Sequence, residues 1–302
     1  MRLILVGGSG LLGSALALGA KARGAQVVIV SRTPKPSPRW ESVSVDVGAC
    51  EAIRTLSPMV AGADHVINLA AVTDVDRCES EDSAEVINAD WPVRLAAECA
   101  RHKVALTQIS TDAAYSLKAG SASEQDMPSP LNAYAKQKVR ADAGVLEVFP
   151  QACVVRMSFF GWSPQPHRGL AGWLVHALRR GTSVKGFADV VFNPLYTGHA
   201  SEILLDLVGL HASGIIHLGA RACCSKLEFA RGLAATFELG VHLIDPGSLQ
   251  DANLAAPRPH RTCLSTLRAQ RLLGRSMPTL QEALVQMKLD EVVLRTQIET
   301  QF

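Results

Sequence analysis

The chain has 302 residues, of which 48% are hydrophobic and 19% are charged, and its formal net charge is +2. A chain of this length can bury a large core and form one large domain or two linked ones. The nearly balanced charge gives no reason to expect nucleic acid as a partner. No apolar run reaches the length of a membrane-spanning helix, so no membrane partner is expected. This composition is typical of an enzyme that acts on a small molecule.

The seven cysteines are scattered along the chain, and none of them forms a CxxC pair. An odd, scattered set predicts reduced thiols and a cytoplasmic location. Cys223 and Cys224 are adjacent but lack the partner spacing of a metal site, so no metal ion is expected. Met1 and Arg2 lead directly into a predicted core strand, which fits no signal peptide.

The first predicted strand, residues 3–6, leads directly into a glycine-rich turn and then a helix. This is the context that a dinucleotide-binding fingerprint needs, here with the spacing GxxGxxG. Gly7 permits the tight turn, Gly10 lets the backbone approach a pyrophosphate, and Gly13 lets the helix pack closely on the strand. The N–H groups at the start of the helix then face the phosphates. The cofactor residues predicted at this turn are Gly7, Gly10, Leu11, Leu12 and Gly13.

The second predicted strand, residues 26–30, ends at Ser31 and Arg32, with no carboxylate to take the ribose hydroxyls of NADH. Arg32 can instead pair with an adenosine 2′-phosphate, so the sequence favours NADPH (NADP⁺) over NADH. The alternative is an ordinary surface arginine after a strand. Asp46, followed by Val47, is placed either to accept from the adenine amino group or to hold a turn.

Strand-like and helix-like stretches alternate along the chain. Strands are expected at residues 3–6, 26–30, 42–46, 65–69, 104–109 and 153–157, with a returning strand at 214–218. This alternation predicts an α/β fold with a Rossmann-type, doubly wound parallel sheet. Such sheets bind ligands beyond the carboxyl ends of their strands. The cofactor residues predicted beyond the fourth strand are Leu69, Ala70 and Ala71, and the segment Ser110–Asp112 follows the fifth.

The alternating pattern loosens after about residue 158, where glycines, prolines and aromatic residues become frequent. We therefore predict a dinucleotide-binding Rossmann domain at residues 1–158, to which 188–219 return, and a smaller C-terminal substrate-binding region at 159–187 and 220–302. Residues 280–298 are predicted to form a helix whose apolar stripe faces the core.

Tyr134 and Lys138 are four residues apart and lie downstream of Thr111. On a helix, two residues at this spacing share one face and can meet the same ligand. A free tyrosine has a pKa of about 10, and a nearby ammonium lowers it. Tyr134 can then exchange a proton while Thr111 holds a carbonyl oxygen. The three residues predict reduction of a ketone or oxidation of an alcohol, although a tyrosine–lysine pair alone is also common on exposed helices.

With these residues in view, the chain resembles the extended short-chain dehydrogenase/reductase superfamily, and within it the dTDP-4-dehydrorhamnose reductase group. The resemblance covers nearly the whole chain. It rests on Val66–Ala71, Ser110–Asp112, the approach from Glu124 through Asn132 to Tyr134 and Lys138, Val155–Ser158 and Arg258–Pro259. It implies that Thr111, Tyr134 and Lys138 are catalytic and that Tyr134 and Lys138 also contact the cofactor.

The resemblance implies an NADPH-dependent ketoreductase that acts on a nucleotide-linked keto-deoxy sugar, with the hydride from nicotinamide and the proton from Tyr134. The substrate residues that it implies are Thr73, Asp112, Phe159, Arg258 and Arg261. It is compatible with a homodimer. For Asn88, two roles stay open, namely holding a proton-relay water or bonding the backbone. His217, within an apolar strand, is interpreted as a satisfied core histidine.

Several residues depart from the pattern of this group. Ala113–Leu117 replace its aromatic residues and Asp-Gly turn, Phe159 replaces a tryptophan near the sugar, and His260–Thr262 replace smaller polar residues. The first two of these departures line the substrate pocket by resemblance, so they concern the substrate more than the chemistry. Two alternatives therefore stay open: a ketoreductase of a non-sugar metabolite, and a non-catalytic NADP-binding subunit like the regulatory subunit of methionine adenosyltransferase.

Overall fold

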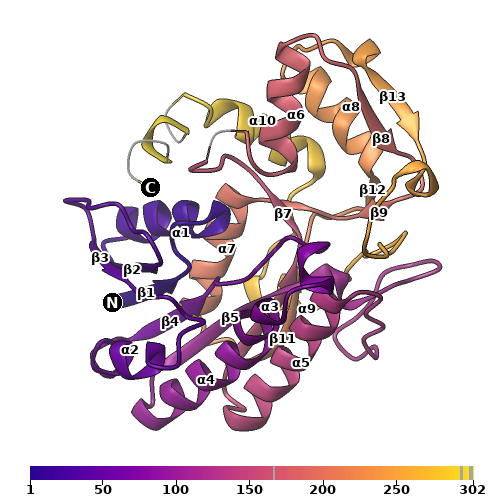
Figure 1. Cartoon of the computed structure of the whole chain (residues 1–302). Coiled ribbons are helices and arrows are strands. Elements are labelled where there is room, and N and C mark those ends of the chain that lie inside the picture. Colours follow the sequence, from indigo (N-terminus) through magenta and orange to yellow (C-terminus); the bar gives the residue numbers. More distant parts are fainter. Residues whose placement is uncertain (166, 293–294, 299–301) are drawn as a thin grey trace.

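The computed structural model describes residues 1–165, 167–292, 295–298 and 302. At its centre is a seven-stranded parallel sheet in the order β11-β6-β5-β4-β1-β2-β3 (Figure 1). Its strands are β1 (Arg2–Val6), β2 (Gln26–Ser31), β3 (Glu41–Ser44), β4 (His65–Asn68), β5 (Ala105–Thr111), β6 (Cys153–Met157) and β11 (Gly214–Leu218). Each of the strands expected from the sequence is confirmed, with ends that differ by at most two residues.

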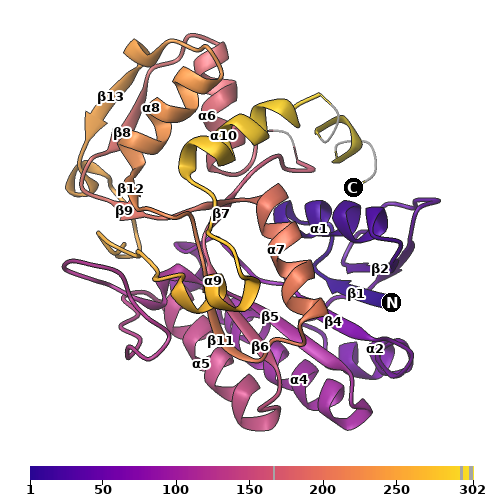
Figure 2. The same ribbon diagram turned by 180° about the vertical axis from the view of Figure 1, so that it is seen from behind.

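Both faces of the sheet are buried, and this explains why its strands read as apolar runs rather than as alternating patterns. In β1, Leu3 and Leu5 belong to one core, and Ile4 and Val6 belong to another. The first core is closed by α1 (Leu11–Ala22), α7 (Thr197–Gly209) and α9 (Leu267–Leu273), and the second by α2 (Ala52–Ala61), α4 (Trp91–His102) and α5 (Ala133–Val148). Figure 1 views the sheet from the side of α4 and α5, and Figure 2 views it from the side of α7 and α9. The predicted doubly wound α/β fold is confirmed.

The strand order changes direction at β1, which pairs with β2 on one side and with β4 on the other. A doubly wound sheet binds its ligands in the crevice that this change opens at the carboxyl ends of the strands. The turn at Gly7 follows β1, and the segment at Leu69 follows β4. The Leu69 N–H donates to the Val6 carbonyl at 2.7 Å. Two of the predicted cofactor segments are therefore adjacent in space.

A separate apolar core lies outside the sheet, in the upper part of Figure 1. Its elements are α6 (Leu170–Arg179), α8 (Lys226–Thr236), α10 (Leu280–Leu289), β8 (Val184–Phe187) and β13 (Ile244–Gly247). All of them fall within the predicted substrate-binding region. One segment of that region packs elsewhere, because Ala269 of α9 and Met277 lie in the core beneath the sheet.

The helix predicted over residues 280–298 is not continuous in the structure, because the chain leaves the helix at residues 290–292, although residues 295–298 are helical again. α10 ends at Leu289, and Asp290 forms its C-cap. The Asp290 carboxylate accepts from the Tyr196 hydroxyl at 2.8 Å and from the Gln286 amide at 2.9 Å, so the chain is held where the helix stops. Residues 293–294, which belong to the predicted helix, lie outside the described residues.

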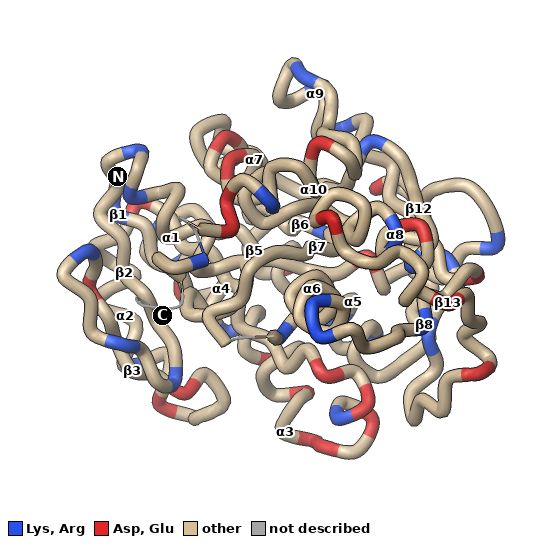
Figure 3. The backbone as a smooth tube through the Cα atoms, turned by 90° about the horizontal axis from the view of Figure 1, so that it is seen from above, with Lys and Arg blue, Asp and Glu red and all other residues tan. Residues whose placement is uncertain are grey.

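Basic and acidic residues are interspersed in the view of Figure 3, which agrees with the small net charge. None of the helices in the described part of the chain is long and apolar enough to cross a membrane. The described residues also contain no cluster of three or more histidine, cysteine or acidic side chains that could hold a metal ion.

Candidate active site

The turn after β1 brings backbone unusually close to backbone. Gly7 has a φ of +80°, and a Cβ atom at this residue would lie 2.7 Å from the backbone N of Ala70. A Cβ atom at Gly13 would lie 2.6 Å from the Cα of Gly8, because α1 rests directly on the turn. Gly10, the N-cap of α1, supplies no side-chain cap to the first N–H groups of the helix. Uncapped N–H groups at a helix start are a binding site for phosphate.

The neighbouring predicted cofactor residues lie around the same edge. Leu12 is buried, whereas Leu11, Leu69, Ala70 and Ala71 are partly exposed and border the turn. The Ser31 hydroxyl, at the end of β2, is buried and has no hydrogen-bond partner among the described residues. Arg32 is exposed and lines a cavity of about 510 Å³ together with Ser42 and Ser44. The Ser42 and Ser44 hydroxyls donate to the Lys35 and Arg32 carbonyls, at 3.1 Å and 2.8 Å. The donors left for a ribose phosphate are the Ser31 hydroxyl and the Arg32 guanidinium, which fit a cofactor of the NADP type.

Asp46 holds a turn, which is one of the two roles that the sequence left open for it. Its Oδ1 accepts from the backbone N–H of Gly48 at 3.0 Å. The side chain of Val47 lies in the core beneath β2 and β3. Contacts of either residue with a cofactor stay predictions.

The start of α5 is fixed by two caps that place Tyr134 in the first turn of the helix. The Asn132 side chain accepts from the Ala135 N–H at 2.9 Å, and the Glu79 carboxylate accepts from the Ala133 N–H at 2.8 Å. Thr111 is the last residue of β5. Its hydroxyl lies close enough to the Tyr134 phenol to lower the pKa of that phenol. The structure therefore brings together the first two predicted catalytic residues.

Lys138 lies one helical turn after Tyr134 and is almost completely buried. Its Nζ donates to the Ile109 carbonyl at 2.8 Å. Burial lowers the pKa of Lys138 to about 8, and the nearby Asp142 carboxylate opposes part of this shift. The ammonium is thus held beneath the end of β5 rather than on the helix surface.

The pKa of Tyr134 shifts in the direction opposite to the one expected from the sequence. Burial raises the pKa of the phenol, the charge of Asp112 raises it further, and the hydrogen bond with Thr111 only partly offsets them. The expected lowering by Lys138 is wrong for this state, because that ammonium is directed to Ile109 and faces Asp142. Tyr134 therefore holds its proton at neutral pH, which is the form that can protonate a ketone oxygen.

A buried polar network beneath the site was not found from the sequence. The Asp142 carboxylate accepts from the Ser110 hydroxyl and from the Arg156 Nε, both at 2.9 Å. The Arg156 Nη1 donates to the Tyr115 hydroxyl at 2.7 Å. The available signal was the spacing of Asp142, which is four residues after Lys138 and so on the same face of α5.

His217 lies at the far end of this network and is fully buried. Its Nε2 lies 3.2 Å from the Tyr115 hydroxyl, and its Nδ1 lies 3.1 Å from the Ala122 carbonyl. The interpretation as a satisfied core histidine is confirmed. Asn88 bonds backbone, because its side chain accepts from the Val72 N–H at 2.8 Å and donates to the Val72 carbonyl at 3.0 Å.

Asp112 connects the end of β5 to the C-terminal part of the chain. Its Oδ2 accepts from the Thr262 hydroxyl at 2.6 Å. Burial raises the pKa of Asp112, while the Thr262 hydrogen bond and the charge of Lys226 oppose the shift. The sequence indicated Asp112 but neither of these partners.

The other predicted substrate residues lie on separate segments of the chain. Thr73 is exposed on the loop after β4. Phe159 is partly buried in β7 (Phe159–Phe160), which pairs with β10 (Leu195–Tyr196). Arg258 donates to the Asp76 carboxylate at 2.9 Å, and Arg261 donates to the Gly120 carbonyl at 3.2 Å. An arginine has five N–H donors, so both keep donors for a ligand.

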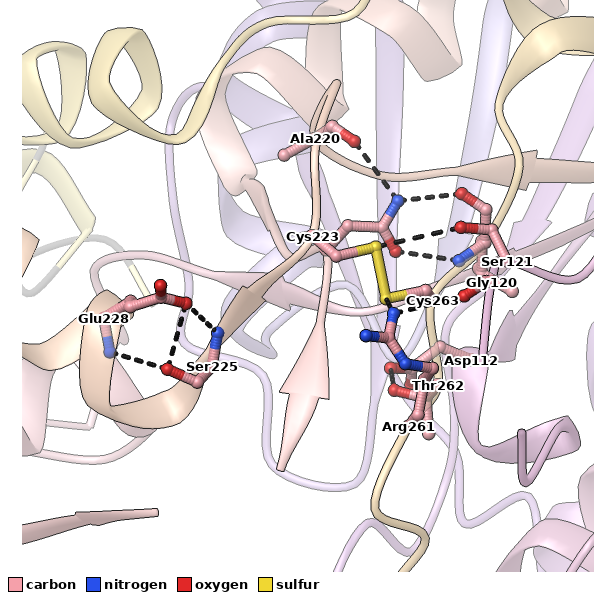
Figure 4. The surroundings of a disulfide bond; sticks show 12 residues. Asp112, Gly120, Ser121, Ala220, Cys223, Ser225, Glu228, Arg261, Thr262 and Cys263 are labelled. Atoms are coloured by element: carbon pink, nitrogen blue, oxygen red, sulfur yellow. Dashed lines mark hydrogen bonds between the residues drawn. A yellow bond between two sulfur atoms is a disulfide. The ribbon is translucent and has the colours of Figure 1, made fainter. Parts of the chain in front are cut away.

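A disulfide lies beside this substrate edge, and the expectation that the thiols are all reduced is wrong for one pair. Cys223 and Cys263 are joined, with their Cα atoms 6.1 Å apart (Figure 4). Asn193 holds both segments, because its Nδ2 donates to the Ala220 carbonyl at 3.2 Å and to the Leu264 carbonyl at 2.9 Å. Sequence spacing gave no sign of this pairing, which depends on tertiary contacts. The five other cysteines are free.

Comparison with known proteins agrees with this fold and site. The profile of the RmlD substrate binding domain family matches residues 1–293. The chain is 31% identical over 282 residues to a dTDP-4-dehydrorhamnose reductase of Mycolicibacterium smegmatis, covering 89% of this chain and 79% of that protein. It is 29% identical over 289 residues to the probable low-salt glycan biosynthesis reductase Agl14 of Haloferax volcanii, covering 94% of this chain and 96% of that protein.

The fold matches that of a solved structure as well. The crystal structure of dTDP-4-dehydrorhamnose reductase from Bacillus anthracis in complex with NADP superposes with a TM-score of 0.85 and 22% identity, covering 96% of this chain and 99% of that chain. The resemblance inferred from the sequence motifs is therefore confirmed: the chain belongs to the RmlD substrate binding domain family.

Proposed function

We propose that this protein is an NADPH-dependent reductase of a nucleotide-linked 4-keto-6-deoxy sugar. The observation that carries the proposal is the placement of three residues: Thr111 at the end of β5, Tyr134 in the first turn of α5, and the buried Lys138 one turn later. This group of residues lies at the carboxyl end of β5, on the edge of the sheet where the glycine turn also lies. Relatives named dTDP-4-dehydrorhamnose reductase support the same reaction class.

NADPH, when bound, supplies the hydride that the ketone carbon accepts. Tyr134 gives its phenolic proton to the ketone oxygen, so that a C=O group becomes a secondary alcohol. Thr111 hydrogen-bonds the same oxygen and positions it. Lys138 is proposed to hold the nicotinamide ribose, because its ammonium donates to the Ile109 carbonyl and keeps further N–H donors.

The proposed cofactor site extends along the carboxyl edge from β1 to β4 and β5. Its residues are Gly7, Gly10, Leu11, Leu12, Gly13, Ser31, Arg32, Asp46, Val47, Leu69, Ala70, Ala71, Tyr134 and Lys138. The unpaired Ser31 hydroxyl and the exposed Arg32 guanidinium support a 2′-phosphate on the adenosine side, and therefore NADPH rather than NADH.

The proposed substrate site begins where Asp112 meets Thr262. Thr73, Asp112, Phe159, Arg258 and Arg261 are its proposed residues. The two arginines suit the diphosphate of a nucleotide, because guanidinium groups bind phosphate through paired hydrogen bonds. We propose the same division for the whole chain: a cofactor domain at 1–158 with 188–219, and a substrate region at 159–187 and 220–302. A homodimer stays a prediction.

The experiment that tests this function follows the loss of absorbance of reduced nicotinamide with purified protein. Turnover is expected with a dTDP-linked 4-keto-6-deoxyhexose and should be poor with the free keto sugar, because binding of the nucleotide helps to orient the ketone. Equal rates with the free sugar, or turnover only with small non-sugar ketones, would favour the metabolite reductase. Tight NADPH binding without turnover of any ketone, together with a stable protein partner, would favour the regulatory subunit.

A further inference from the structure

A lysine that the sequence did not single out lies at the substrate edge. Lys226 is the first residue of α8, directly after β12 (Cys224–Ser225). Its Nζ lies 3.7 Å from the centroid of the Phe192 ring. A cation over an aromatic face is held by the ring's electrostatic field, and more strongly where water is excluded. The contact therefore keeps this ammonium against the protein rather than extended into solvent.

Short strand pairings bring Lys226 and Asp112 to the same place. β12 pairs with β9 (Val191–Phe192), and the Lys226 N–H donates to the Val190 carbonyl at 2.9 Å. The Thr262 N–H donates to the next carbonyl along that strand, Val191, at 3.0 Å. Because the Thr262 hydroxyl also donates to Asp112, the lysine and the carboxylate are anchored to one short strand (Figure 4 shows Asp112, Thr262 and the start of α8).

The two charged groups influence each other without forming a direct ion pair. Burial lowers the pKa of Lys226 and raises that of Asp112, and each charge opposes the shift of the other. No hydrogen bond or ion pair joins the two side chains in the part of the chain that the structure describes. Lys226 Nζ likewise donates to no other described group, so it retains donors for a ligand between it and Asp112.

The chemistry of the pair selects one kind of ligand group. An ammonium only donates hydrogen bonds, and an ionised carboxylate only accepts them, whereas a hydroxyl does both. A carboxylate or phosphate on the ligand would be repelled by Asp112. An apolar group would leave the buried Lys226 ammonium without a hydrogen-bond acceptor, which is costly. A neutral hydroxyl satisfies both side chains at once.

We propose that Lys226 and Asp112 bind a substrate hydroxyl on the carbon next to the ketone, with Lys226 donating to its oxygen and Asp112 accepting its proton. The position follows from the order of residues, because Asp112 directly follows Thr111, which is proposed to hold the ketone oxygen, and the Thr111 hydroxyl donates to Asp112 Oδ1 at 3.4 Å. This inference depends on the proposed function and adds a requirement to it. The substrate is an α-hydroxy keto sugar, and Lys226 is a residue that determines its specificity.

Calorimetric titration with two ligands tests this role without relying on turnover. The first ligand is a dTDP-6-deoxyhexose with hydroxyls at C3 and C4, and the second is its 3-deoxy analogue; both are titrated in the presence of NADP⁺. The variant Lys226→Met keeps the length of the side chain and removes its charge. The matched control is Lys288→Met in α10, whose ammonium pairs with Glu238 at 2.9 Å, outside the proposed site.

Lys226→Met is expected to weaken binding of the hydroxylated ligand by about 10- to 100-fold, the range for a hydrogen bond to a charged group. Binding of the 3-deoxy ligand should change less than about threefold, and Lys226→Arg should restore most of the selectivity. Lys288→Met should alter neither, and NADP⁺ affinity should be the same in all four proteins.

The outcomes separate this inference from the proposed function. If Lys226→Met weakens both ligands equally, or neither, while the wild-type protein binds the hydroxylated ligand, the specificity role is wrong and the proposed function stands. If the wild-type protein binds neither nucleotide sugar, the proposed function is wrong and this inference falls with it.

Discussion

Tyr134 is the residue on which the proposed chemistry depends most directly. Replacing it with phenylalanine removes one oxygen and leaves shape and apolar burial almost unchanged. Turnover should fall by a factor of about 10²–10⁴, the range for general acid–base catalysis. The melting temperature and the NADPH affinity of Tyr134→Phe should stay close to those of the wild-type protein. A turnover rate close to that of the wild-type protein in a steady-state assay of this variant would show that Tyr134 is not the proton donor.

His65 gives a residue-level prediction about stability. It is buried in β4, and its Nε2 lies 2.8 Å from the Thr107 hydroxyl. Burial lowers the pKa of His65 to about 4. Because the pKa in the folded state is below the usual value of about 6.5, the contribution of His65 is fully present above that value and is lost as the pH falls towards 4.

Between about pH 7.5 and about pH 5.5, protonation of the unfolded chain at His65 should lower the free energy of unfolding by about 1.4 kcal/mol. Urea titrations at the two pH values measure the loss. His65→Gln can keep a hydrogen bond to Thr107 but does not titrate, so its loss should be smaller by about that amount. Identical pH dependence in the two proteins would mean that the pKa of His65 is the same in the folded and unfolded states.

Single residues differ in how far the sequence could predict them. Gly7, Thr111 and Tyr134 were found because each belongs to a local pattern beside a strand or on a helix face. Lys226 belongs to no such pattern, since its place beside Asp112 depends on pairing between β9 and β12. The direction of the Tyr134 pKa shift was also out of reach, because it depends on how deeply the phenol is buried and where the Lys138 ammonium points.

The packing of α1 on the turn after β1 gives a prediction for an element. A Cβ atom at Gly13 would lie 2.6 Å from Gly8 Cα, and both are backbone positions that cannot easily yield. Gly13→Ala should therefore destabilise the protein by about 1–3 kcal/mol, the range for overpacking. It should also weaken NADPH binding, because the first turn of α1 moves. Chemical denaturation and cofactor titration measure the two effects.

Gly172, in the first turn of α6, is the matched control. A Cβ atom at this position meets nothing within 4 Å among the described residues. Gly172→Ala should stabilise the helix by about 0.5–1 kcal/mol, since alanine loses less backbone freedom on folding. If the two alanine variants change the stability in the same way, the close approach of the backbone at Gly13 is not the reason why this position needs a glycine.

Strands and helices could be predicted from the sequence where their apolar patterns extend over several residues. Most strands of the sheet are buried on both faces, and their apolar runs reveal them, whereas the edge strand β3 has only Val43 as an apolar residue and is partly exposed. β7, β9, β10 and β12 have two residues each, which is too short for any periodicity, yet they position the substrate edge. The end of α10 was missed because it depends on Tyr196, a residue distant in sequence that bonds Asp290.

Across the whole molecule, the candidate site lies where its two main parts meet. Thr111 and Asp112 come from the sheet, whereas Thr262 and Lys226 come from segments after it. Figure 4 places the disulfide in the same neighbourhood, with Cys263 next to Thr262 and Cys223 shortly before Ser225 at the start of α8. A bond at this place holds together the two segments that face Asp112.

The Cys223–Cys263 bond therefore yields a prediction for the whole chain. Thiol titration of the denatured protein should find five thiols before reduction and seven after it. The two cysteines are 40 residues apart, and a crosslink over such a loop contributes about 4 kcal/mol in the chain-entropy model. Reduction should thus lower the urea midpoint by a corresponding amount. Cys263→Ser should lose the same stability and no longer respond to reductant. Seven thiols before reduction would show that the pair is not bonded in solution and that the sequence-based expectation of reduced cysteines was right.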